Sequence, residues 1–131
     1  LNFSDTGQGR GIVCFDYDLD GDIDVFVANN QQAPALYRND GGNDQNFLTI
    51  KISGEDLNSE AIGARVYLTT GEITQMREIY AGSNFISNNP SEAYFGLGDY
   101  TVINELRVVW PSGEEKVLTD IPANQMLTIF K

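Results

Sequence analysis

The stretch FDYDLDGDIDVF, residues 15–26, places aspartates at five alternate positions: Asp16, Asp18, Asp20, Asp22 and Asp24. Like charges this close together repel one another and raise the free energy of any compact state. Oxygen ligands on alternate residues of a tightly turned loop can converge on one hard cation, and calcium accepts about 6–8 of them. The spacing therefore predicts a calcium site in which the ion offsets the repulsion.

The remaining loop positions favour calcium without favouring an EF-hand. Counted from Asp16 as position 1, Gly21 stands at position 6, where the backbone must turn sharply, and Asp22 at position 7 usually ligates through its carbonyl oxygen. Val27 occupies position 12, where an EF-hand needs a bidentate Glu, and residues 23–28 have the composition of a β-strand. Magnesium is less favoured because it keeps more water, and a solvated acidic turn without an ion would leave the repulsion uncompensated.

Short β-strands at residues 10–15 and 23–28 are predicted to position this loop as the turn of a hairpin. Residues 29–46 are rich in Asn, Gly and Gln, which indicates loops and turns, so we place a domain boundary between segments 1–44 and 45–131. No convincing helical periodicity follows, and residues 81–100 are expected to form a long loop. The chain is therefore predicted to be all-β: an antiparallel β-sandwich or barrel-like domain preceded by the calcium-loop hairpin. The further strands are expected at 47–53, 61–69, 74–81, 104–110, 114–118 and 125–130.

Composition excludes several classes of function. The 131 residues include 19 acidic and 8 basic ones, for a net charge of −11, which disfavours nucleic acid and anionic membranes as partners. No apolar run is long enough to span a membrane, so no membrane insertion is expected. The absence of histidine excludes Ser-His-Asp and Cys-His catalysis, and Cys14, the single cysteine, reads as a small buried apolar residue. We expect the chain not to be an enzyme; a carboxylate-based hydrolase is the less favoured alternative.

Residues 9–29, GRGIVCFDYDLDGDIDVFVAN, and the following LYRND resemble the FG-GAP or VCBS repeats of integrin-type β-propellers. Those repeats carry the pattern D-x-D-x-D-G-x-x-D. The resemblance implies that Asp16, Asp18, Asp20, Asp22 and Asp24 are calcium ligands, and that calcium ties the two strands of the hairpin together.

Residues 46–131 resemble the ASPIC/UnbV domain, a resemblance carried by IGARV, FGLG and VWPSG. In that family FG-GAP repeats precede the domain, which is the order found here. The resemblance implies an extracellular, cell-surface or periplasmic protein that acts through contacts. Calcium modules of low affinity also need a calcium-rich compartment.

The sequence supports two hypotheses about function. The leading hypothesis is a non-catalytic, calcium-binding module for adhesion or protein interaction, in which calcium is structural. The alternative is a carbohydrate-binding module, based on the amides and aromatic residues at 81–100. Segment 1–44 supplies only about one propeller blade, whose edges would be open. Three arrangements would cover these open edges. The chain could belong to a longer propeller protein, the hairpin could dock on the C-terminal sheet, or two chains could form a homodimer through exposed strand edges.

Overall fold

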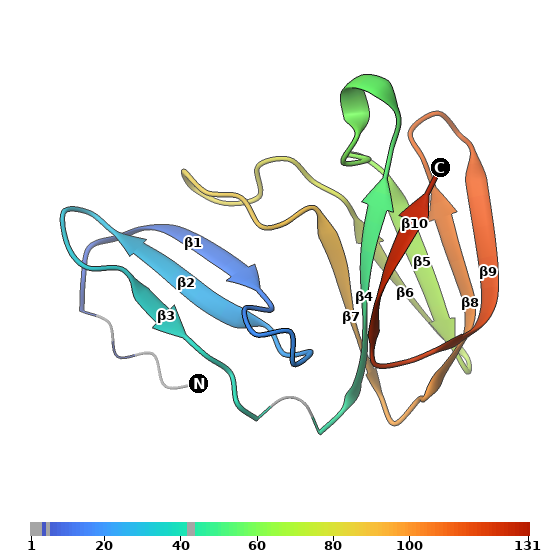
Figure 1. Cartoon of the computed structure of the whole chain (residues 1–131), viewed down its shortest axis with the longest axis horizontal. Coiled ribbons are helices and arrows are strands. Elements are labelled where there is room, and N and C mark those ends of the chain that lie inside the picture. Colours follow the sequence, from blue (N-terminus) through green and yellow to red (C-terminus); the bar gives the residue numbers. More distant parts are fainter. Residues whose placement is uncertain (1–3, 5, 42–43) are drawn as a thin grey trace. The chain divides into compact units, whose positions relative to one another are not determined.

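The computed structural model describes residue 4, residues 6–41 and residues 44–131, and nearly all of its regular structure is β (Figure 1). Its one helical segment within those residues is a single 3₁₀ turn, η1, at Asp56–Asn58. The all-β prediction is confirmed. The strands are β1 (Gly9–Phe15), β2 (Asp24–Asn29), β3 (Ala35–Tyr37), β4 (Asn46–Ser53), β5 (Arg65–Thr70), β6 (Ile73–Glu78), β7 (Glu92–Gly98), β8 (Val102–Val109), β9 (Glu115–Pro122) and β10 (Gln125–Phe130).

The strands fall into two compact units. The first unit comprises Leu1–Asp44 together with Ala81–Pro90, and the second comprises Gln45–Tyr80 and Ser91–Lys131. The first unit contains one antiparallel sheet in the order β1-β2-β3. Phe15 at the end of β1 pairs with Asp24 at the start of β2, so the aspartate loop is the turn of a hairpin.

The second unit is a sandwich of two open sheets, with strand orders β10-β4-β7 and β6-β5-β8-β9. Of the two predicted alternatives, the sandwich is therefore correct. One pairing differs from the antiparallel expectation: β10 runs parallel to β4, with Leu127 opposite Ile50. In Figure 1 the two arrows point the same way. A parallel pair needs a long connection, and here the whole of β5 to β9 supplies it.

The core of the second unit is built from alternate residues of its strands, since successive side chains on a strand point to opposite faces. Phe95 is its largest fully buried side chain. Leu106 and Val108 on β8 and Trp110 directly after it are all buried, as the alternation of apolar residues at these positions predicts. The other large members are Leu48, Ile50, Ile52, Val66, Leu68, Ile79, Leu97, Ile103, Ile121 and Ile129.

The predicted loop at residues 81–100 needs correction, because its second half is strand β7. Ala93, Phe95 and Leu97 alternate along β7 and all three are buried. Gly96 and Gly98 alternate with these residues and lower the β propensity of the segment, so the sequence pattern did not predict a strand here. Strand pairing with β4 and burial in the core override that local preference.

The first half of the segment, residues 81–90, packs in the first unit along the outer edge of β1. The Ser87 hydroxyl donates to the Ile12 carbonyl (2.8 Å) and accepts from the Ile12 amide (3.1 Å). The Asn84 side chain also donates to the Ile12 carbonyl, and Asn89 Oδ1 accepts from the Cys14 amide (3.0 Å). Side chains thus satisfy edge groups that another strand would otherwise pair with, which removes the basis for a homodimer through this edge.

Replacing Ser87 with alanine is expected to weaken this edge by about 0.5–1.5 kcal/mol, the net value of a typical hydrogen bond. The Ile12 amide should then exchange its hydrogen with solvent several-fold faster, as measured by NMR. Ser112→Ala, at an exposed serine of the second unit, is the matched control. Equal exchange rates at Ile12 in wild type and Ser87→Ala would contradict this role.

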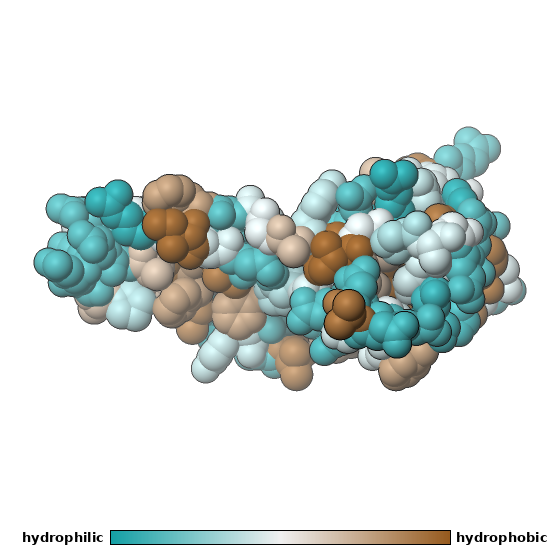
Figure 2. Space-filling view, turned by 90° about the horizontal axis from the view of Figure 1, so that it is seen from above, coloured by the Kyte–Doolittle hydropathy of each residue, from teal (hydrophilic) through white to brown (hydrophobic). Residues whose placement is uncertain are grey.

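On the face that Figure 2 shows, hydrophilic side chains predominate, and apolar side chains both gather in a group in the left part of the picture and lie singly elsewhere. Among the described residues, no helix has the length and apolarity needed to cross a membrane. The larger exposed apolar side chains include Leu19, Phe85, Ile86 and Phe130. Exposed apolar side chains are ordinary on folded proteins.

Candidate metal site

The aspartate loop turns back on itself through two residues with left-handed backbone. Leu19 has φ 62° and Gly21 has φ 98°. Glycine adopts that conformation without strain, as predicted for position 6 of the loop. Asp16 then closes the turn, because its two carboxylate oxygens accept hydrogen bonds from the backbone amides of Asp20 (3.2 Å) and Gly21 (3.0 Å).

This folding brings Asp16, Asp18 and Asp24 together. One carboxylate oxygen from each lies within 4.8 Å of the other two. Two oxygens on opposite sides of a calcium ion, each at about 2.3–2.6 Å from it, are about 5 Å apart. The three carboxylates therefore have both the donor chemistry and the spacing that calcium requires. Asp18 is exposed, Asp16 is half-buried and Asp24 is buried, so an ion could enter from the solvent side.

Asp24 is the buried anchor of the cluster, with 0 % of its surface exposed. Its Oδ2 accepts from the Tyr17 amide (2.8 Å) and its Oδ1 from the Asn39 amide (2.7 Å). These bonds hold the carboxylate at the junction of the loop and the segment after β3. Each oxygen has a second lone pair, so the bonds leave capacity for a metal. Buried charges are normally paired with a cation or bound to a metal.

Asp20 and Asp22 lie outside the three-carboxylate cluster. Asp20 Oδ1 accepts from the backbone amide of Asp22 at 2.9 Å, a contact that shapes the turn. Asp22 is buried, with 5 % of its surface exposed. Their ligand roles, like those of the other three aspartates, stay predictions.

One basic residue contacts the cluster. Arg38 Nη1 lies 3.6 Å from Asp18 Oδ2, and its Nε lies 2.6 Å from Asp40 Oδ1. Loss of hydration, followed by the negative charges of Asp20 and Asp24, raises the pKa of Asp18, and Arg38 offsets part of that rise. The motif LYRND resembles part of an FG-GAP repeat but does not by itself indicate that Arg38 and Asn39 reach the carboxylates. The roles of Arg38 and Asn39 depend on β3, a three-residue strand too short to be predicted.

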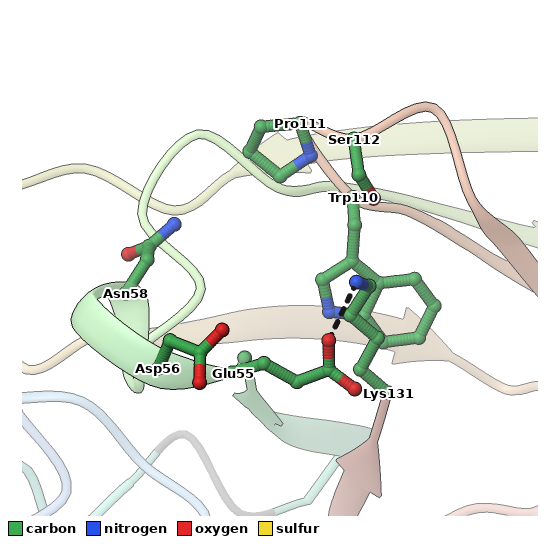
Figure 3. Close-up of a pocket in the computed structure, with 8 residues that line it drawn as sticks. Glu55, Asp56, Asn58, Trp110, Pro111, Ser112 and Lys131 are labelled. Carbon is green, nitrogen blue, oxygen red and sulfur yellow. Dashed lines mark hydrogen bonds and ion pairs between the residues drawn. The ribbon is translucent and has the colours of Figure 1, made fainter.

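A separate cavity of about 200 Å³ in the second unit offers less chemistry (Figure 3). Lys131, Glu55 and Trp110 line it. The Lys131 ammonium is already paired, at 2.9 Å from Glu55 and 3.2 Å from Glu114. The Trp110 ring is buried and its N–H donates to the Ser53 carbonyl (3.3 Å). The Lys131 ammonium and the Trp110 N–H thus already have partners within the protein, so the aspartate loop is the stronger candidate site.

Two family models match this chain, and they overlap at residues 54–71. A family model described as ASPIC and UnbV matches residues 54–131, and one described as FG-GAP-like repeat matches residues 16–71, starting at the first aspartate of the loop. The chain is 27 % identical over 129 residues to human cartilage acidic protein 1, covering 95 % of this chain and 19 % of that protein. It is 30 % identical over 129 residues to the mouse protein, covering 95 % and 20 %, and 30 % identical over 112 residues to the Xenopus tropicalis protein, covering 82 % and 17 %. The chain thus spans about a fifth of the length of the curated relatives it matches.

Proposed function

Because the chain belongs to the ASPIC/UnbV family and carries an FG-GAP-like repeat, we propose that it is a non-catalytic, calcium-binding module for protein interaction outside the cytoplasm. The observation that carries the proposal is the convergence of Asp16, Asp18 and Asp24 within the matched repeat. Asp20 and Asp22 complete the proposed ligand set. Bound calcium supplies positive charge that neutralises the crowded carboxylates and ties β1 to β2.

The proposed calcium is structural because the ligands come from the turn that joins two strands. The Asp24 carboxylate already links the loop to the backbone after β3. An ion held by Asp16, Asp18 and Asp24 adds a second link across the same hairpin. Extracellular calcium modules bind at about 10⁻⁴–10⁻³ M, which suits an extracellular, cell-surface or periplasmic location.

The carbohydrate-binding alternative is based on the amides and aromatic residues of segment 81–100. Asn84 and Asn89 instead bind the backbone of β1, and Ser87 does the same. Those three side chains are therefore less available to a glycan, although Phe85 remains exposed. A protein ligand is therefore the better supported partner class.

Calorimetric titration at pH 7 tests the calcium site. Wild type is expected to bind calcium and to melt at higher temperature in millimolar calcium, since a ligand that binds only the folded state stabilises it. Asp18→Asn removes one ligand charge from an exposed position and should lower the affinity at least tenfold. Asp56→Asn is the matched control, because Asp56 is exposed, lies in the second unit and has a φ of 51° that Asn also tolerates. Absence of heat and of any melting shift in wild type would overturn the proposal.

A further inference from the structure

Arg38 is placed to compete with a bound cation. It follows β3 directly, and its guanidinium lies between two acidic residues: Nη1 is 3.6 Å from Asp18 and Nε is 2.6 Å from Asp40. The next residue, Asn39, donates its amide to Asp24. The segment after β3 therefore brings one positive charge to the exposed member of the carboxylate cluster.

The positive charge of Arg38 stabilises the carboxylate cluster when no metal is bound and disfavours a bound cation. In the calcium-free protein, the guanidinium offsets part of the repulsion among Asp16, Asp18 and Asp24. Once a divalent cation occupies the cluster, the same guanidinium repels it and competes for an oxygen of Asp18. Asp40 offers Arg38 an alternative partner, so release of Asp18 does not leave the guanidinium unpaired.

We propose that Arg38 sets the calcium affinity of this loop by acting as a built-in competitor for Asp18. The inference rests on the proposed calcium site and names a residue outside its ligand set. Arg38 is exposed, so water screens its charge and the effect is moderate. Removal of the charge is expected to tighten calcium binding by roughly 3- to 10-fold.

The test compares calcium affinities of wild type, Arg38→Gln, Arg38→Lys and Arg10→Gln by calorimetry at low and high NaCl. Arg38→Gln is expected to bind more tightly by the stated factor, and the gain should shrink at high salt. Arg38→Lys keeps the charge and should stay close to wild type. Arg10→Gln makes the same change in net charge near the start of β1, at the opposite end of that strand from the loop, and should change the affinity less than twofold.

Melting of the calcium-free proteins gives a second readout. Arg38→Gln should melt at lower temperature than wild type without calcium and gain more from calcium addition. Equal or weaker binding by Arg38→Gln, with wild type binding calcium, overturns the role of Arg38 and leaves the calcium site standing. An equal gain from Arg10→Gln would also overturn it, because the effect would then be one of net charge. If neither wild type nor Arg38→Gln binds calcium, the proposed site fails and the inference fails with it.

Discussion

Removal of calcium with a chelator is expected to destabilise the β1-β2-β3 sheet by about 2.7 kcal/mol, for protein previously held at 100 times the dissociation constant. The reason is that the ion binds only when the loop is folded, so its binding free energy adds to the stability of the hairpin. Without it, carboxylate oxygens of Asp16, Asp18 and Asp24 remain within 4.8 Å of one another, and Arg38 is the one positively charged side chain among the described residues that pairs with them.

Amide hydrogen exchange measures this change strand by strand. Protection of the paired amides in β1 and β2, such as those around the Val13–Phe26 pair, should fall about 100-fold on chelation. Amides of the β5–β8 pair, which lie in the second unit, serve as the internal reference. Asp18→Asn should gain less protection from calcium than wild type at the same calcium concentration. Unchanged protection in wild type after chelation would show that no structural ion had been present.

Replacement of Phe95 with alanine is expected to lower the free energy of unfolding by about 3–5 kcal/mol, the range for a large aromatic residue lost from a core. Phe95 is 1 % exposed in the middle of β7 and belongs to the buried core cluster, whose members come from both sheets of the sandwich. The Arg77 guanidinium lies over the same ring, 5.2 Å from its centre, so a cation–π contact is lost as well.

Urea denaturation followed by the fluorescence of Trp110, the single tryptophan, measures the loss in the second unit. Calcium should be held at one concentration throughout, because it also affects stability. Phe130→Ala is the matched control: it makes the same substitution on β10 at a side chain that is 63 % exposed, and should cost about 0.5 kcal/mol or less. Equal losses from the two variants would contradict the assignment of Phe95 to the core.

Turns and buried strand faces could be predicted from the sequence because they depend on residues that are close together in the chain. The alternation of aspartates and the glycine at position 21 predicted a tight turn between two strands, and the structure has one, with Gly21 at positive φ. The apolar residues Leu106, Val108 and Trp110 alternate in the sequence, which is typical of a buried strand face, and all three are buried. Strand β7 was missed because its glycines resemble turn residues.

Contacts between segments that are distant in the sequence could not be predicted from local patterns. By contrast, the spacing of the aspartates, on which the calcium prediction rests, is a property of nine consecutive residues. Only the tertiary structure decided that Arg38 and Asn39 reach the loop, that β10 lies parallel to β4, and that Ser87 and Asn89 bind β1 across 75 positions of the chain. Such contacts depend on how whole strands pair and pack, because a single hydrogen bond is too weak to close so long a loop on its own.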